Sequence, residues 1–282
     1  MGQRKWIATL MIVIAGLMFG CAGKDFGNER TAPKAVAKEK DMIETRRETS
    51  KEEILVAAAI SLKNVYEEKL IPMFQVQHPG VTVKGTYDSS GKLQTQIQEG
   101  LEADVFMPAA QKQMRALVKE GLIAPESVVN LLENKIVLIV PPGNENELET
   151  FEDIEKVNRI ALGDPASVPA GQYAREALTS LGLWDELQER LSLGSHVTEV
   201  LNQVAAASAD AGIVYATDAA FIEDRVYVVA EAPDGSISEK IIYPAAVIKN
   251  STHPDTAEKF VEFLQTEAAM RVFESYGFSR GE

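Results

Sequence analysis

The sequence predicts an α/β fold built as two domains with a ligand cleft between them. Short apolar runs alternate with segments whose apolar residues repeat at helical spacing, which is typical of α/β proteins. Two long apolar runs, 135–140 and 241–248, bracket the middle third of the chain, as expected where one domain is inserted into another. The first domain is therefore predicted to be discontinuous (53–136 and 244–282), and the second to be 137–243. A chain that crosses twice between domains permits hinge closure over a ligand.

The N-terminus has the pattern of a secretory signal. Arg4 and Lys5 precede the apolar run 6–19, which is too short to span a bilayer comfortably. Cys21 follows this run and is the only cysteine, so no intramolecular disulfide can form. The Gly20-Cys21 pair resembles a bacterial lipidation site. We expect residues 1–20 to be a signal peptide and Cys21 to be lipidated after cleavage; the alternative is a plain signal peptide with an incidental cysteine.

Residues 21–52 are predicted to be a flexible tether between this anchor and a folded body that begins near Ile54. The segment is rich in charged residues, Thr and Ala, with Phe26 as its one aromatic residue, so it cannot bury enough surface to order itself. A solvated helix of mixed charge is the alternative interpretation.

The chain is strongly acidic, with a formal net charge of −14. Removing residues 1–20, which contain two basic residues and no acids, makes the charge −16. This balance disfavours nucleic acid and anionic membrane surfaces as partners. It also means that any site for an anion must work through local dipoles rather than long-range attraction.

Two serines follow predicted strands of the first domain. Ser61 comes directly after the apolar run 54–60 and is expected to cap the helix that follows it, or to point its hydroxyl into the cleft. Ser90 follows the alternating strand 81–87. The remaining elements expected here are strands at 103–107 and 135–140 and helices at 62–74, 92–97 and 110–120.

The turn 164–174 in the second domain separates a predicted strand, 159–163, from a predicted helix, 173–178. Pro169 suits the start of a helix, and Ala170 and Gly171 are small enough for their N–H groups to approach a ligand closely. A helix N-terminus of this kind binds anions, although a well-capped turn that binds nothing would have the same local chemistry.

The other elements of the second half follow the same alternation. Thr217 and Asp218 are expected to cap a turn after a strand, and Pro244 to mark a bend or an edge strand. Trp184 is expected to anchor a helix. Strands are predicted at 210–215, 226–230 and 241–248, and helical segments at 148–157, 183–191, 199–207, 255–265 and 267–276.

Five positions at such junctions form the candidate site, and they supply hydroxyl and backbone N–H donors without a formal charge. The first two belong to the first domain and the other three to the second, so a closed cleft could gather all of them. They are Ser61, Ser90, Ala170, Val197 and Tyr215.

Several strings in the sequence are similar to those of the molybdate-binding proteins of bacterial ABC importers. They include Ala57-Ala-Ala-Ile-Ser-Leu62, Asp88-Ser-Ser-Gly91, Gly163-Asp-Pro-Ala-Ser-Val-Pro-Ala-Gly171 and Gly212-Ile-Val-Tyr215. The resemblance covers about 54–280 and implies a periplasmic-binding-protein-like fold. It also implies that an oxyanion is held by the hydroxyls of Ser61, Ser90 and Tyr215 and by N–H groups at Ala170 and Val197. Asp88 is expected to point away from the anion.

The donor chemistry matches this expectation. Molybdate and tungstate are dianions near neutral pH that accept hydrogen bonds and donate none, whereas monohydrogen phosphate would require an acceptor for its proton. Sulfate has the same hydrogen-bonding character, so only cavity size would discriminate against it. We therefore expect a monomeric extracytoplasmic lipoprotein that delivers molybdate or tungstate to an ABC permease. It is expected to have no cofactor and no enzymatic activity.

Two alternatives remain open from the residues alone. One is a binding protein for sulfate or another oxyanion, and the other is a cell-surface hydrolase or adhesive lipoprotein. A hydrolase would need a base beside Ser61 or Ser90, and no nucleophile-elbow or phosphate-loop motif is present in the sequence. The three histidines, at positions 78, 196 and 253, lack the spacing of metal ligands and are expected at the surface or in loops.

Overall fold

The computed structural model describes residues 52–143 and 148–281. The predicted signal peptide, Cys21 and all but the last residue of the predicted tether lie outside these residues. Glu52, the first described residue, already pairs with Val81 in a β-ladder, close to the expected start of the folded body near Ile54. None of the described helices is long and apolar enough to span a membrane.

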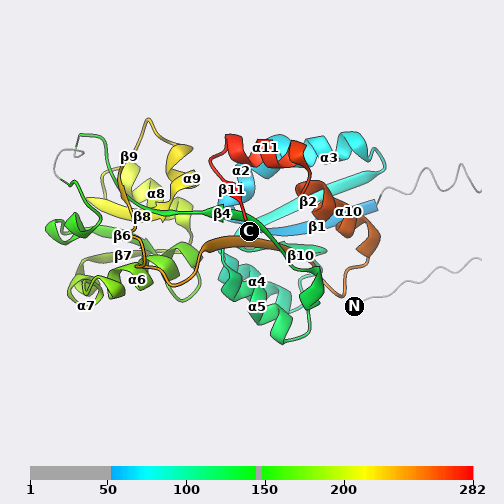
Figure 1. Ribbon diagram of the computed structural model, residues 1–282, viewed down its shortest axis with the longest axis horizontal. Helices are drawn as coiled ribbons and strands as arrows, with labels where there is room; N and C mark the ends of the chain where they lie inside the picture. Colours follow the sequence, from blue (N-terminus) through cyan, green and yellow to red (C-terminus); the bar gives the residue numbers. More distant parts are fainter. Residues whose placement is uncertain (1–51, 144–147, 282) are drawn as a thin grey trace, which may run out of the picture. The chain divides into compact units, whose positions relative to one another are not determined.

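The described chain forms two separate β-sheets, which confirms the predicted α/β class. The first is six-stranded, and the second is five-stranded. Figure 1 shows the two sheets with the helices around them. We call each sheet with the helices that pack on it a lobe. In spatial order the first sheet contains β11 (Ser279–Arg280), β4 (Val129–Asn134), β10 (Ile241–Val247), β3 (Val105–Met107), β1 (Glu52–Ala59) and β2 (Val81–Asp88). The second contains β7 (Leu191–Gly194), β6 (Ile160–Gly163), β8 (Ala211–Tyr215), β5 (Ile136–Val140) and β9 (Tyr227–Glu231).

Helices of the first lobe cover both faces of its sheet. Residues of β1 alternate between two buried clusters: Ala57 packs with Leu93 and Ile97, whereas Val56 and Ala58 face the opposite side. Burial on both faces explains why β1 is a nearly continuous apolar run. The helical segments are η1 (Ile60–Leu62), α2 (Lys63–Val65), η2 (Tyr66–Leu70), α3 (Ile71–Gln77), α4 (Ser90–Gln98), α5 (Gln111–Lys119), η3 (Pro125–Ser127), α10 (Pro254–Leu264) and α11 (Glu267–Ser275).

The second lobe carries its longest helix directly after β6. This helix, α6 (Pro169–Ser180), begins at Pro169 instead of the predicted 173, because proline is well suited to the first turn of a helix. The predicted helix 148–157 is wrong, since only a short 3-10 segment forms there. The helical segments are η4 (Glu152–Lys156), α6, α7 (Trp184–Leu187), η5 (Gln188–Arg190), α8 (Val197–Ala205) and α9 (Ala216–Ala220).

The chain passes between the sheets twice, from β4 to β5 and from β9 to β10. The first crossing is abrupt: Asn134 ends β4 and Ile136 begins β5, with only Lys135 between them. Strand β4, which lies antiparallel to β10, was not predicted from the sequence. Pro244 interrupts the register of β10 at a bulge, as a bend should, but β10 pairs on both sides and is not an edge strand. The two-domain boundaries stay a prediction.

Candidate functional site

Each candidate residue lies where a strand ends and a helix begins or is about to begin. Ser61 follows β1 and Ser90 follows β2, and these strands are parallel neighbours. Ala170 follows β6, Val197 follows β7 and Tyr215 ends β8, which are parallel to one another in the second sheet. The carboxyl ends of parallel strands share one edge of a sheet, so each lobe presents its candidate residues along one edge.

The turn before α6 is shaped for close backbone approach. A Cβ on Gly171 would lie 1.8 Å from the carbonyl oxygen of Gly163, so only glycine fits at this position. Ala170 is the second residue of the helix, where a backbone N–H has no partner within the helix. Pro169 fills the preceding position without an N–H. The donors of this first turn are therefore available to a group outside the helix.

The turn before α6 also touches the first lobe. The N–H of Gly91, in the first turn of α4, donates to the carbonyl oxygen of Ser167 at 2.9 Å. A Cβ on Gly91 would lie 2.5 Å from that same oxygen, so the close contact requires glycine. Gln113 Nε2 donates to Gln172 Oε1 at 3.2 Å nearby. The N-termini of α4 and α6 thus meet across the two lobes.

Ser90 and Tyr215 are joined through the backbone of Ala109. Ser90 Oγ accepts a hydrogen bond from the Ala109 N–H at 2.9 Å, and Tyr215 Oη donates to the Ala109 carbonyl at 3.0 Å. Both side chains are buried. Because Ser90 acts as an acceptor here, its own hydrogen stays available for a ligand. Ala109 acts through its backbone, so no side-chain pattern could have indicated its part.

A second serine hydroxyl adjoins Ser90. Ser89 Oγ is buried and has no hydrogen-bond partner among the described residues. An unsatisfied buried hydroxyl costs about 1–3 kcal/mol, so a donor left in this state beside Ser90 fits an acceptor ligand. Ser89 was not among the predicted site residues, although the Ser-Ser pair after β2 is visible in the sequence.

The Ser61 hydroxyl contacts Asp218, an acid that was predicted to cap a turn. Ser61 Oγ donates to Asp218 Oδ2 at 2.8 Å, across 157 positions of sequence. Of the two roles expected for Ser61, the capping role is not found, and the predicted cap at Asp218 is wrong: Ala59 is the N-cap of η1 and Tyr215 that of α9, and neither cap is made by a side chain. Burial raises the pKa of Asp218 to about 7, and the hydrogen bond from Ser61 opposes that rise.

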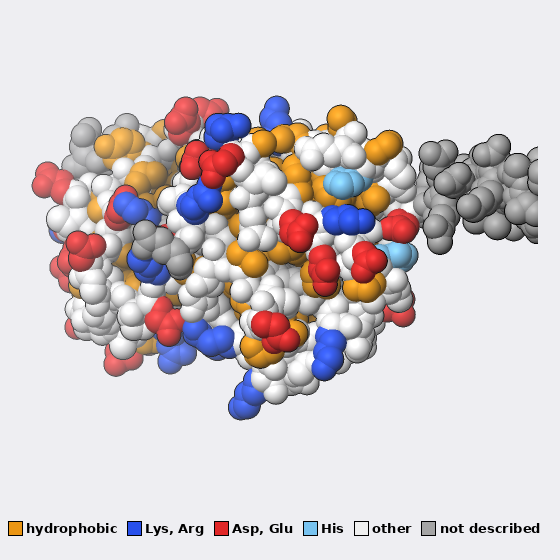
Figure 2. All heavy atoms as spheres, turned by 45° about the vertical axis from the view of Figure 1, so that its right-hand side comes forward, with side chains coloured by type: hydrophobic (Ala, Val, Ile, Leu, Met, Phe, Trp, Pro, Cys, Tyr) orange, Lys and Arg blue, Asp and Glu red, His pale blue; other side chains and the backbone are white. Residues whose placement is uncertain are grey.

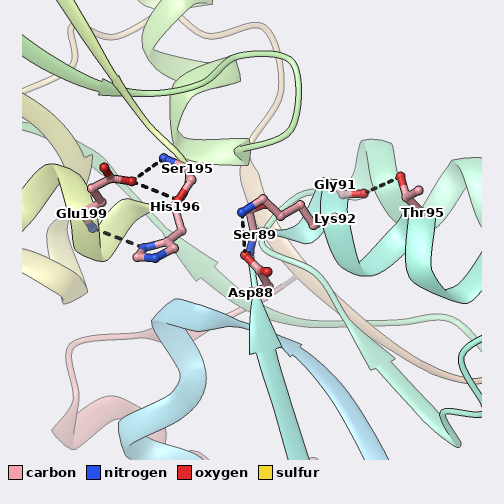
Figure 3. Close-up of polar contacts among 8 residues, drawn as sticks. All are labelled: Asp88, Ser89, Gly91, Lys92, Thr95, Ser195, His196 and Glu199. Atoms are coloured by element: carbon pink, nitrogen blue, oxygen red, sulfur yellow. Dashed lines mark hydrogen bonds and ion pairs between the residues drawn. The ribbon is translucent and has the colours of Figure 1, made fainter.

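Val197 is the first residue of α8, where its N–H also lacks a partner within the helix. His196 is the N-cap, and its Nδ1 accepts from the Glu199 N–H at 3.2 Å (Figure 3). The Glu199 carboxylate accepts from Ser195 N and Oγ, which lowers the pKa of Glu199. Helix α8 contacts η1, so the first turn of α8 and Ser61 belong to neighbouring segments.

The acid beside Ser90 is already engaged locally. Asp88 Oδ1 accepts from the Ser89 N–H at 2.7 Å and pairs with Lys92 Nζ at 3.3 Å (Figure 3). Lys92 also helps to lower the pKa of Glu199, so its charge acts on both lobes. Asp88 is therefore compensated by its own helix.

Ser61 is the candidate residue that lines a recognisable pocket. This pocket has a volume of about 300 Å³ and includes Asp218, Lys63 and Tyr276 among its lining residues. The other four candidate residues are at most 3% exposed. The contacts described above bring all five segments to the junction of the lobes, and the hydroxyls and first-turn N–H groups there carry no formal charge.

The face of the molecule drawn in Figure 2 has side chains of both charges, and the acidic and basic side chains are interspersed over it. The histidines have local roles: His78 stacks on Phe74, and His196 and His253 are N-caps. Among the described residues, no group of three or more His, Cys, Asp or Glu side chains could hold a metal ion.

Two lobes joined by two chain crossings, with neutral donors where they meet, define a ligand-binding protein. A family model of bacterial extracellular solute-binding proteins matches residues 54–279, and the chain belongs to that family. This membership confirms the predicted binding role outside the cytoplasm and identifies a protein that is not an enzyme. Similarity to solved structures of periplasmic binding proteins confirms the periplasmic-binding-protein-like fold.

Individual relatives are similar over most of their length. The Bacillus subtilis lipoprotein YvgL, named as a substrate-binding protein of an ABC transporter, is 39% identical over 80% of this chain and 86% of its own. The molybdate-binding protein ModA of Haemophilus influenzae is 36% identical over 80% of this chain and 89% of its own. A solved substrate-binding domain ascribed to a molybdenum ABC transporter of Clostridium difficile is 37% identical, with a TM-score of 0.64 over 82% of this chain and 99% of that one.

Proposed function

We propose that this protein captures molybdate, and tungstate as a close analogue, and delivers it to an ABC importer. The observation that carries this proposal is the donor set at the lobe junction. Three hydroxyls, from Ser61, Ser90 and Tyr215, lie there with the first-turn N–H groups of Ala170 and Val197, and none of these groups carries a charge. The Ser90 hydrogen is available to a ligand, whereas the hydrogens of Ser61 and Tyr215, now donated to Asp218 and to the Ala109 carbonyl, must turn to the anion when it binds. The names of the relatives ModA and the molybdenum-transporter domain support the same ligand.

Such a set matches a fully ionised tetrahedral dianion. Molybdate accepts hydrogen bonds at all four oxygens, and a hydrogen bond to a charged group contributes about 1.5–3 kcal/mol. The first turns of α6 and α8 add the favourable end of the helix dipole without requiring an arginine. Five to seven such bonds suffice for tight binding after the entropic costs of association.

The contacts between lobes support a hinge-closing mechanism. Gly91 N–H to Ser167 O and Ser61 Oγ to Asp218 Oδ2 both join residues of different lobes. An anion that accepts bonds from both lobes favours the arrangement in which they touch. In this proposal, 53–136 with 244–282 and 137–243 move as the two domains.

Attachment to a membrane forms the second part of the proposal. A lipid on Cys21 would hold the binding protein near the permease, with residues 22–52 as the tether. The relative YvgL is named a lipoprotein, which supports this anchor. Mass spectrometry of the mature N-terminus tests it: a diacylglyceryl group on Cys21 is expected, and an unmodified Cys21 would contradict it.

Isothermal titration of the purified protein with molybdate, tungstate, sulfate and phosphate tests the ligand. We expect submicromolar binding of molybdate and tungstate with no heat from phosphate. Binding of sulfate alone would retain the donor set and change the substrate. Absence of heat with all four anions would overturn the proposed function.

A further inference from the structure

Asp218 is a buried acid that the donor set does not use. Its residue surface is 9% exposed, and its carboxyl lies in contact with Ser61, one of the proposed donors. Ser61 is the hydrogen-bond partner that the described residues supply to this carboxyl. A buried acid with one neutral partner and no cation in contact among the described residues is costly to keep ionised.

The hydroxyl of Ser61 has a single hydrogen, and this fact limits what it can do. If the Asp218 carboxyl is ionised, it accepts that hydrogen, and Ser61 has none for an anion. If the carboxyl is protonated, it donates to Ser61 Oγ over the same 2.8 Å, and the hydrogen of Ser61 becomes available to an oxyanion. The two protonation states of Asp218 therefore decide whether Ser61 can donate to the ligand.

The groups that contact Asp218 do not change their charge near neutral pH, so Asp218 is the acid whose protonation changes there. Tyr215 and Tyr243 both interact with its charge, and burial raises the pKa of each phenol well above its ordinary value, so both stay neutral. Asn134 commits its amide hydrogens to Thr217 and Tyr243 rather than to the acid. Other titratable groups face the same pocket or the adjoining segments; these are Lys63, Tyr276 with its partner Glu68, and His196 at the start of α8.

We propose that Asp218 is a positioning residue whose protonated carboxyl holds Ser61 as a donor, so that capture of the oxyanion takes up one proton from solvent. The proton binds Asp218, the Asp218 O–H donates to Ser61 Oγ, and the Ser61 O–H donates to the anion. This inference rests on the proposed function, because it assumes a tetrahedral oxyanion at Ser61. The raised pKa of Asp218, about 7, places the effect in an accessible pH range.

Titration calorimetry with sodium molybdate in buffers of different ionisation enthalpy measures the proton directly. For an acid that titrates near pH 7 and is protonated when the anion is bound, uptake is about 0.1 proton per anion at pH 6 and about 0.9 at pH 8. The affinity should fall about tenfold between these two values. Zero uptake at pH 8 with molybdate bound would overturn the inference and leave the proposed function standing.

Two variants identify the group that takes up the proton. In Asp218→Asn the amide N–H donates to Ser61 at every pH, so uptake should vanish and the affinity should vary less than twofold from pH 6 to 8. Asp224→Asn removes the same charge from an exposed position of the same lobe and should retain the wild-type slope. A wild-type slope in Asp218→Asn would assign the effect to another group, such as His196, and overturn the inference.

A third variant tests the route through Ser61. In Ser61→Ala the Asp218 carboxyl no longer has a hydroxyl to which it can donate. Binding of the anion therefore gains little from protonating Asp218, and proton uptake at pH 8 should fall well below the wild-type value. Undiminished uptake would show that Asp218 acts on the anion independently of Ser61 and would overturn its positioning role. If wild-type protein binds no tetrahedral oxyanion at all, the proposed function fails, and this inference fails with it.

Discussion

The two serines of the first lobe follow neighbouring parallel strands, yet their hydroxyls lie in opposite environments. Ser90 Oγ accepts from a backbone N–H at 2.9 Å and keeps its hydrogen. Ser61 Oγ donates to the Asp218 carboxyl at 2.8 Å and has its hydrogen engaged. Ser90 is therefore ready to donate at any pH, whereas Ser61 depends on the charge of a neighbour. Two serines at equivalent positions of a sheet can thus differ in whether their hydrogen is available to a ligand, because the partner of each hydroxyl comes from elsewhere in the chain.

The largest expected effect concerns the acid that distinguishes the two serines. The pKa of Asp218 is raised from an ordinary 3.8 to about 7 in the folded protein. Between these values the unfolded chain releases the proton more readily than the folded chain, so stability falls as pH rises. The contribution of Asp218 to the free energy of unfolding is fully present below about pH 4. It is lost as pH rises, and above about pH 7 the loss is complete and amounts to about 4 kcal/mol at most.

Asp218→Asn removes this dependence. Urea unfolding of the variant and the wild type at pH 5 and pH 8 should show the variant gaining stability relative to wild type as pH rises, by up to about 3 kcal/mol. Asp224→Asn, an exposed control, should give the same difference from wild type at both pH values. A constant difference for Asp218→Asn as well would mean that Asp218 ionises normally in the folded protein.

Ser90→Ala tests the donor whose hydrogen is available. The variant loses a hydrogen bond to a charged ligand and leaves the Ala109 N–H without its buried partner. We expect molybdate affinity to fall about a hundredfold or more, about 3 kcal/mol, by the same factor at pH 6 and pH 8. Ser275→Ala, which removes an exposed hydroxyl from α11, is the control and should change affinity less than twofold. Unchanged affinity in Ser90→Ala would remove Ser90 from the site.

Gly91→Ala perturbs the backbone contact beside Ser90 without removing a hydroxyl. Its new Cβ would lie 2.5 Å from Ser167 O, so the two lobes must separate slightly or shift. We expect a ten- to hundredfold loss of affinity, since overpacking of this kind costs about 1–3 kcal/mol. Gly80→Ala is the matched control, because a Cβ added at Gly80 would meet no atom within 4 Å. Equal affinities for the two variants would show that the Gly91–Ser167 contact is not needed for binding.

Ser61→Ala should have the smallest effect of the series. At pH 6 the loss of one donor should weaken molybdate binding about fivefold, about 1 kcal/mol. At pH 8 the two affinities should be about equal, or the variant slightly tighter, because wild-type binding has by then weakened about tenfold through the proton that Asp218 must take up, and the variant largely lacks this dependence. Calorimetry at the two pH values measures both. A loss as large as that of Ser90→Ala at pH 8 would mean that the two serines are equivalent after all.

Much of the site was predictable from local sequence patterns. An apolar run followed by Ser61 and an alternating run followed by Ser90 place these residues at the ends of parallel strands, as found. Pro169 and Gly171 mark a tight helix start where backbone N–H groups are accessible. These features follow from backbone conformation and side-chain size, which act over a few residues and are therefore visible in the sequence.

The tertiary structure decided which groups these residues meet. Ser61 reaches an acid 157 positions away, Ser90 and Tyr215 share the backbone of Ala109, and Gly91 touches Ser167 across the lobes. Strand β4 was missed because its place beside β10 depends on a pairing more than 100 positions distant in the chain. The sequence by itself determined where donors stand along the chain. Only the folded structure decides whether these groups are protonated, which hydrogen-bond partners they have and which of them touch across the lobes. The reason is that burial and partners distant in the chain exist only after folding.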